Sequence, residues 1–247
     1  MTAAASEGVA PALEGLEAGT LPDGVRLVLV RHGETDWNMV RRIQGQLDEP
    51  LNAVGVQQAK AAAARFAPGM VDAIHCSDLL RASQTAAAIG AVTGVPVVPE
   101  AVWRERHFGR FQGWVYADIQ RDDPETYRRI EARDPDLDLQ GGESLMQVRA
   151  RIEAALAGLV QRYRGQRVVV VSHGGVLDAI YRLVTGKPVS EPRDFPSTTP
   201  ASVSCAGRPC AGRSCNGRTS RIWWPVGTRS TRGSGRRRCW AGSARLP

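Results

Sequence analysis

Two histidines stand in matching places in the sequence. His32 follows the apolar run of residues 27–30 and His173 follows the apolar run of residues 168–171, each with one polar residue between. A glycine comes directly after each histidine, which lets the chain turn and lets a ligand approach the backbone closely. One histidine in such a place is more often structural. Two equivalent placements predict that both imidazoles line one pocket.

Arginines suited to a tetrahedral phosphate accompany these histidines. Arg31 directly precedes the first histidine, and Arg81 lies near the start of a predicted helix. A guanidinium is a planar fork of donors that can bind two oxygens of an oxyanion at once. An exposed helical arginine would explain Arg81 equally well if it stood alone. Asn38, Gln44 and the backbone amide of Gly45 could line the rim of the pocket.

Strands and helices alternate along the chain and bring the histidines to one edge of a sheet. The strands are short apolar runs without a polar face, as in parallel strands covered on both sides. We therefore expect an α/β fold, a three-layer sandwich with a mainly parallel central sheet covered by helices on both faces. Reactive groups collect at the carboxyl ends of such strands. The predicted strands span residues 25–30, 71–75, 95–98 and 167–171, and the predicted helices span residues 52–66, 78–92, 143–163 and 176–184.

The composition of the 247 residues, 43% apolar and 23% charged, is that of a globular domain. No apolar run reaches the roughly 18 residues of a membrane-spanning helix. The first residues lack the pattern of a secretory signal, so we expect a cytoplasmic protein. The net charge of +7 is uneven, because residues 197–247 hold ten arginines and no acidic residue, which leaves −3 for residues 1–196. We predict a flexible leader (1–23), one folded domain (24–196) and a disordered tail (197–247).

The tail, residues 197–247, has no hydrophobic period and predicts neither helix nor strand. Its richness in Arg, Gly, Ser, Cys and Trp resembles GC-rich DNA translated in a shifted frame, and permitted codons exist for which the other frame has a strand pattern. We favour such a frameshift, which would uncover a sheet edge and lower stability. A genuine basic arm that binds RNA and a metal-binding cysteine cluster are alternatives, although the spacing of Cys205, Cys210 and Cys215 is not that of a zinc site.

Five motifs together resemble the histidine phosphatase superfamily, in its phosphoglycerate mutase-like branch. The resemblance covers residues 25–196, and the first motif is the most specific. In chain order the motifs are LVRHGETDWN (29–38), SDLLRA (77–82), ERHFG (105–109), GES (142–144) and SHGG (172–175).

The resemblance implies covalent catalysis. His32 would be the nucleophile that becomes phosphorylated, Arg31, Arg81 and His173 would form the phosphate pocket, and Glu105 would be the proton donor. A neutral imidazole can attack phosphorus and hold the phosphoryl group, which splits one difficult displacement into two. Fixed positive charge stabilises the transferring oxygens. A surface salt bridge with a neighbouring arginine is the structural alternative for Glu105.

The remaining expectations concern ligands. We expect Asn38, Gln44, Gly45, Arg106 and Gly174 to bind substrate. We expect no metal, because the acidic residues do not form a divalent cluster by spacing. No cofactor is expected either, except 2,3-bisphosphoglycerate if the protein is a mutase. The partner would be a small phosphorylated metabolite, with no nucleic acid and no membrane, and the sequence leaves a homodimer open.

Two activities of the family differ in the segment after the proton donor. Glu105 and Gly142 lie only 37 positions apart, which is shorter than the elaborated segment expected of a mutase. This favours a phosphomonoester hydrolase. The stretch ERHFGRFQG, residues 105–113, also looks mutase-like, so a phosphoglycerate mutase is the second choice. A non-catalytic phospho-ligand binder would be expected to lack one of the key groups, and all five are present.

Overall fold

The computed structural model describes residues 25–192 and the backbone of residues 203–207. Its centre is a five-stranded sheet in the order β3-β2-β4-β1-β5. β1 and β4 pair in parallel, β2 pairs in parallel with both β4 and β3, and β5 runs antiparallel to β1. The strands are β1 (Val25–Arg31), β2 (Ala73–Cys76), β3 (Val97–Pro99), β4 (Arg167–Ser172) and β5 (Val203–Gly207).

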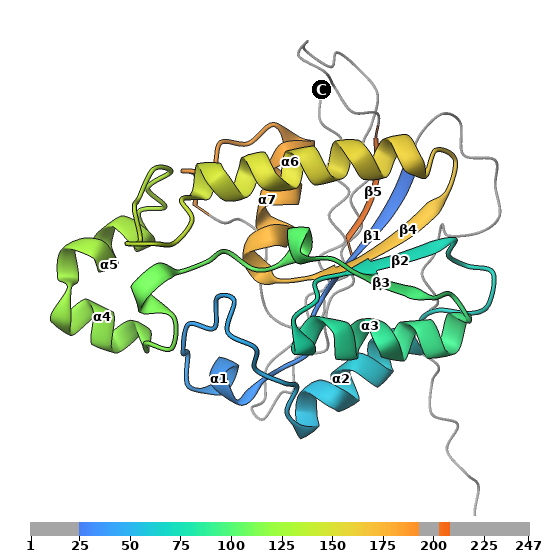
Figure 1. The fold of residues 1–247 in the computed structure, drawn as a ribbon, viewed down its shortest axis with the longest axis horizontal. Helices are drawn as coiled ribbons and strands as arrows, with labels where there is room; N and C mark the ends of the chain where they lie inside the picture. Colours follow the sequence, from blue (N-terminus) through green and yellow to red (C-terminus); the bar gives the residue numbers. More distant parts are fainter. Residues whose placement is uncertain (1–24, 193–202, 208–247) are drawn as a thin grey trace, which may run out of the picture.

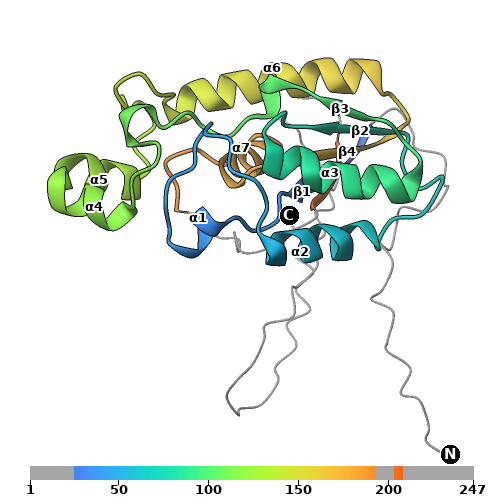
Figure 2. The same ribbon diagram turned by 60° about the horizontal axis from the view of Figure 1, so that its bottom comes forward.

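Helices cover both faces of this sheet, so the expected three-layer sandwich is confirmed (Figure 1). α6 and α7 lie on one face, and α2 and α3 lie on the other, as the second view also shows (Figure 2). α4 and α5 project to one side of the sheet. The helices are α1 (Asp36–Met39), α2 (Ala53–Ala63), α3 (Leu80–Thr93), α4 (Tyr116–Asp122), α5 (Pro124–Glu131), α6 (Leu145–Arg162) and α7 (Gly174–Thr185), with short 3-10 turns η1 (Ala101–Trp103) and η2 (Gly109–Phe111).

The two central strands supply both halves of the core, because successive side chains of a strand point to opposite faces. Leu27 and Leu29 of β1 pack in the cluster under α6 and α7. Val28 and Val30 pack in the cluster with α2 and α3. β4 divides its valines in the same way. Both faces of β1 and β4 are therefore apolar, and only the ends of these two strands remain for polar groups.

Local signals set the boundaries of the helices next to the site. Ser144 caps α6 through a capping box with Gln147, so this helix begins after the expected Glu143. α3 ends at Gly94, which adopts a left-handed φ of 74° that glycine accepts without steric cost. β3 lies at the edge of the sheet, where its last residue, Pro99, is tolerated although it has no backbone donor.

The prediction that the tail forms no regular structure is wrong at one place. The sequence predicts no strand after residue 196, but residues 203–207 form β5, whose backbone pairs with Val25–Leu29 of β1. This side of β1 is therefore paired rather than left uncovered. An antiparallel edge strand is defined by its partner's backbone, so its own sequence needs little hydrophobic period. The leader, residues 193–202 and residues 208–247 lie outside the described residues.

Within residues 25–192, no helix combines the length and the apolar character that crossing a bilayer requires.

Candidate active site

The two predicted histidines lie side by side at the carboxyl ends of neighbouring strands. β1 and β4 are in register up to the pair Arg31 and Ser172, so the next residue of each strand reaches the same edge. The His32 amide donates to the Ser172 carbonyl over 2.9 Å. The ring centroids of His32 and His173 are 5.1 Å apart, with planes inclined by 56°. Parallel pairing thus brings together two residues that are far apart in the sequence.

His32 is held as a neutral ring with one nitrogen available. Its side chain is 6% exposed, and its Nδ1 lies 2.6 Å from the Gly33 carbonyl oxygen. A carbonyl can only accept, so Nδ1 carries the proton and the lone pair is on Nε2. Burial, followed by the charges of Arg31 and Arg81, holds the pKa of His32 well below its usual range. This is the protonation state that a nitrogen nucleophile requires.

His173 is completely buried, at 0% exposure, and caps the start of α7 with its backbone. Neither ring nitrogen has a hydrogen-bond partner among the described residues. Burial and then the charges of Arg81, His32 and Arg31 lower the pKa of His173 well below its usual range. Buried polar atoms are almost always satisfied, so a polar ligand could supply the hydrogen bonds that these two nitrogens lack.

Arg81 brings a buried positive charge to the same edge. Its side chain is 1% exposed, and its terminal nitrogens donate to the carbonyls of Gly45 and Leu47 over 2.7 and 2.8 Å. Its Nε has no hydrogen-bond partner within the described part of the chain. Burial lowers the pKa of Arg81 to about 10, so the group remains a cation at neutral pH. The exposed-helix alternative for Arg81 is therefore wrong.

Glu105 faces this group from the segment between η1 and η2. One carboxylate oxygen accepts from the Arg106 amide over 2.8 Å, and the other accepts from the Gly175 amide at the start of α7 over 2.9 Å. The Glu105 charge also opposes the lowering of the Arg81 pKa, which places the two side chains within electrostatic reach. Glu105 makes no salt bridge within the described residues, so the surface salt-bridge alternative does not describe it.

The predicted substrate-binding residues have different surroundings. Gly45 adopts a φ of 54° and lies beside Arg81, and the preceding Gln44 is buried with an unpartnered Oε1 among the described residues. Gly174 lies against Arg31, since a Cβ there would be 3.8 Å from the guanidinium carbon. Asn38 serves the cap of α1, where its Oδ1 accepts from the Thr35 amide and hydroxyl.

Arg106, the fifth of these residues, points its Nε at the Glu143 carbonyl over 2.6 Å. It is buried, its guanidinium stacks over the Phe108 ring at 5.3 Å, and one terminal nitrogen has no partner among the described residues. Burial lowers the pKa of Arg106 to about 10. Arg106 follows Glu105 in the chain, but its guanidinium donates to the backbone carbonyl of Glu143 and not to the Glu105 carboxylate.

Residues 25–192 contain no group of three His, Cys, Asp or Glu side chains arranged to hold a metal ion. The groups at this edge are instead arginine cations and neutral histidine rings. Such donors bind an oxyanion directly by hydrogen bonds and charge.

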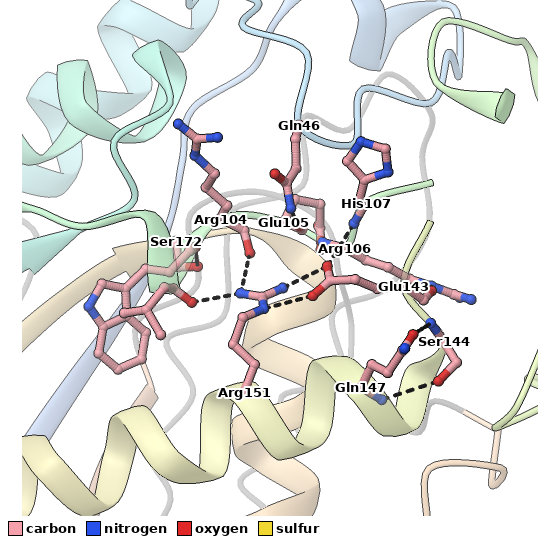
Figure 3. Close-up of polar contacts among 12 residues, drawn as sticks. Gln46, Arg104, Glu105, Arg106, His107, Glu143, Ser144, Gln147, Arg151 and Ser172 are labelled. Carbon is pink, nitrogen blue, oxygen red and sulfur yellow. Dashed lines mark hydrogen bonds and ion pairs between the residues drawn. The ribbon is translucent and has the colours of Figure 1, made fainter. Parts of the chain in front are cut away.

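The residues that hold the backbone around Glu105 were not among the candidates predicted from the sequence. Arg151, on α6, contacts both Glu143 and the backbone carbonyls before Glu105 (Figure 3). Glu143 belongs to a motif already noted, and its position just before a helix cap was an available signal. Arg151 has no such signal, because a helical arginine gives no indication of the loop that it faces.

The structure is that of an α/β protein with two adjacent buried histidines and a buried arginine at the carboxyl edge of its sheet. The chain belongs to the histidine phosphatase superfamily (branch 1), whose family model matches residues 27–214 and so passes the expected end of the resemblance at residue 196. It is similar to two proteins of Arabidopsis thaliana. It is 43% identical over 162 residues to the metal-independent phosphoserine phosphatase, covering 64% of this chain and 68% of the relative. It is 41% identical over 162 residues to phosphoglycerate mutase-like protein 4, covering 64% and 70%.

A solved structure of similar fold is the mycobacterial glucosyl-3-phosphoglycerate phosphatase. Its TM-score is 0.65 at 35% identity, and the match covers 74% of this chain and 91% of that chain. Both phosphatases and a mutase-like protein are therefore among the relatives, as the sequence motifs predict.

Proposed function

We propose that this protein hydrolyses small phosphate monoesters through a phosphohistidine at His32. The observation that carries the proposal is the state of His32, which is buried and neutral with its lone pair on Nε2. Its ring centroid lies 5.1 Å from that of His173, and the charges of Arg31 and Arg81 act on it. A lone pair among fixed positive charges suits attack on a phosphorus atom whose oxygens carry negative charge.

The first step transfers the phosphoryl group to the protein. His32 Nε2 forms a bond to phosphorus while the bond from phosphorus to the ester oxygen breaks. Glu105, in its protonated form, gives a proton to the departing oxygen, which leaves as an alcohol. Arg31, Arg81 and His173 contact the three other oxygens. A bound phosphate favours the charged form of His173, one of whose ring N–H groups then donates to it.

The second step reverses the roles of the same groups. Glu105, now a carboxylate, accepts a proton from water as the water oxygen attacks phosphorus. The bond from Nε2 to phosphorus breaks, and His32 returns to its neutral state as inorganic phosphate leaves. No step uses a metal. The name of the metal-independent phosphoserine phosphatase supports the expectation that the present protein needs no metal. We therefore expect a chelator to leave the activity of the present protein unchanged.

The substrate class follows the same relatives. The names of two relatives contain the substrates phosphoserine and glucosyl-3-phosphoglycerate, which are both small phosphate esters of alcohols. The expectation of a small phosphorylated metabolite is supported at that level. Binding roles for Asn38, Gln44, Gly45, Arg106 and Gly174, a cytoplasmic location and a homodimer stay predictions.

A phosphoglycerate mutase is the second candidate, and the mutase-like relative favours it. The two activities share the first step and differ in whether water or a phosphoglycerate takes the phosphoryl group. Phosphate release should be measured beside conversion of 3-phosphoglycerate to 2-phosphoglycerate, with 2,3-bisphosphoglycerate added. We expect release to dominate, and efficient isomerisation with little release would reverse the assignment.

The direct test traps the intermediate. Rapid acid-free quenching with a substrate labelled in its phosphoryl group should leave label on His32, in a bond that is stable to base and labile to acid. H32A should lose labelling and turnover, yet should still be stabilised against heat by inorganic phosphate if it folds. Turnover that persists in H32A would overturn the covalent mechanism. Phosphate binding without turnover in the wild type would instead identify a non-catalytic binder.

A further inference from the structure

One guanidinium holds the backbone on both sides of Glu105. Arg151 donates from one terminal nitrogen to the carbonyls of Val102 and Arg104, over 2.6 and 3.0 Å. Its Nε and other terminal nitrogen donate to the two carboxylate oxygens of Glu143, over 2.8 and 2.9 Å. Figure 3 shows this group beneath the segment of residues 102–107, called here the Glu105 segment.

Glu143 carries the same support to the far side of Glu105. Its carboxylate accepts from the His107 amide over 2.9 Å, and its own amide donates to the His107 carbonyl over 2.8 Å. Its carbonyl accepts from Arg106 Nε over 2.6 Å. Arg151 therefore contacts the Glu105 segment directly before Glu105 and, through Glu143, directly after it.

These contacts suit Arg151 to fix the position of the Glu105 segment rather than to act on the Glu105 carboxyl through its charge. The side chains of Arg151 and Glu143 are both 21% exposed, so water competes little for their bonds. The pair is bidentate, which fixes angle as well as distance. Arg151 makes no contact with the carboxyl group of Glu105 itself, which accepts from two backbone amides. Any effect on that carboxyl is therefore transmitted through the backbone.

The carboxyl of Glu105 has little room to move without loss of its contacts. A Cβ on Gly175 would stand only 2.3 Å from one of its oxygens, so this carboxyl packs directly on the start of α7. Proton transfer needs the donor oxygen within hydrogen-bond reach of the leaving oxygen, and small misplacements cost large factors in rate. A shift of the Glu105 segment would break this alignment.

We propose that Arg151, acting through Glu143 and the backbone of the Glu105 segment, is a positioning residue for proton transfer by Glu105. The proposal rests on the proposed phosphatase function and adds a residue beyond the pocket to it. The proposal predicts that loss of Arg151 impairs those reactions in which Glu105 must protonate the leaving group.

Two substrates with different leaving groups test this demand. Hydrolysis of an alkyl phosphate such as β-glycerophosphate requires protonation of the alkoxide, whereas p-nitrophenolate departs as an anion. We expect R151A to lower kcat/KM for the alkyl ester by about 100-fold, within the usual range for general acid catalysis, and to lower that for p-nitrophenyl phosphate far less. E105Q should show the same selectivity, and R151A added to E105Q should cause little further loss for the alkyl ester.

Two further variants control for folding and for charge. R151K keeps the positive charge but not the planar fork, so it should share the selectivity of R151A even if the alanine variant folds poorly. R162A removes an exposed arginine from the last turn of the same helix and should leave both substrates unaffected.

Equal losses for both substrates in R151K and R151A would show a general structural role and overturn the proposal, as would an unchanged alkyl phosphatase activity. If E105Q itself lacked the selectivity, the proton-donor role of Glu105 would fail and the proposal with it. Failure to label His32 would refute the covalent function separately, since that experiment does not depend on the leaving group.

Discussion

The two buried histidines should make the fold sensitive to mild acid. In the folded protein, burial and then nearby positive groups hold the pKa of His32 and of His173 well below the usual range. In the unfolded chain both rings titrate near their ordinary value of about 6.5. The unfolded chain therefore binds more protons once the pH falls below that value. Stability from these two rings is fully present above it and is lost as the pH falls.

The magnitude follows from this linkage. Between about pH 7.5 and about pH 5.5, each ring that stays neutral in the folded state lowers the free energy of unfolding by about 1.4 kcal/mol, so the pair lowers it by about 3 kcal/mol. Carboxylates such as Asp72 and Asp78, whose pKa values are lowered by hydrogen bonds to Arg167 and Arg104, contribute only at more acidic pH.

Urea denaturation at a series of pH values measures this effect. The buffers should contain no phosphate, because an anion in the pocket would favour protonated His173. The matched variants are H32N, H173N and the double variant, whose side chains do not titrate. We expect the pH dependence of the double variant to be smaller than that of the wild type by about 3 kcal/mol over this range, with the single variants halfway. An identical pH dependence in all four proteins would refute the reasoning.

Two further predictions concern packing around the site. Asp178 is 3% exposed and pairs with both Arg133 and Arg182, so D178A should leave the buried Arg182 guanidinium without its carboxylate. We expect urea denaturation to show a free energy of unfolding lower by about 3 to 5 kcal/mol in D178A, and a smaller loss in D178N. An effect under about 1 kcal/mol would show that the backbone partners of Arg182 suffice. G175A should displace the Glu105 carboxyl and cut alkyl phosphatase activity by about 10-fold to 100-fold. G158A on α6, where a Cβ meets nothing within 4 Å, is its control and should keep full activity; equal activity of the two would contradict the close packing of Glu105 on α7.

The sequence predicted those parts of the fold that depend on local pattern. The apolar runs of β1 and β4 indicated strands buried on both faces, and the structure confirms them with residues split between two core clusters. The histidines, one residue beyond these runs, were then bound to reach the carboxyl edge of the sheet. Helix ends were predicted nearly as well, because capping by Ser144 and the turn at Gly94 are properties of a few adjacent residues.

Contacts between distant segments were beyond such reasoning. β5 was missed because an edge strand takes its place from the backbone of β1 rather than from a pattern of its own. Nothing in the sequence shows that Arg133 reaches Asp178, or that residues of α4 and α5 pack with Ile43 and Leu137 in a third core cluster. These contacts depend on how layers pack, which long-range register and side-chain direction decide.

The site shows the same division between sequence and tertiary structure. Residue type and position after a strand identified His32 and His173, residue type and position near a helix start indicated Arg81, and the family resemblance alone pointed to Glu105. Only the tertiary structure decided that His32 is neutral with its lone pair on Nε2, since burial and the Gly33 carbonyl set that state. Only packing of α6 against the Glu105 segment gave Arg151 its partners, because hydrogen bonds across 47 and 49 residues of chain exist only once the layers have assembled.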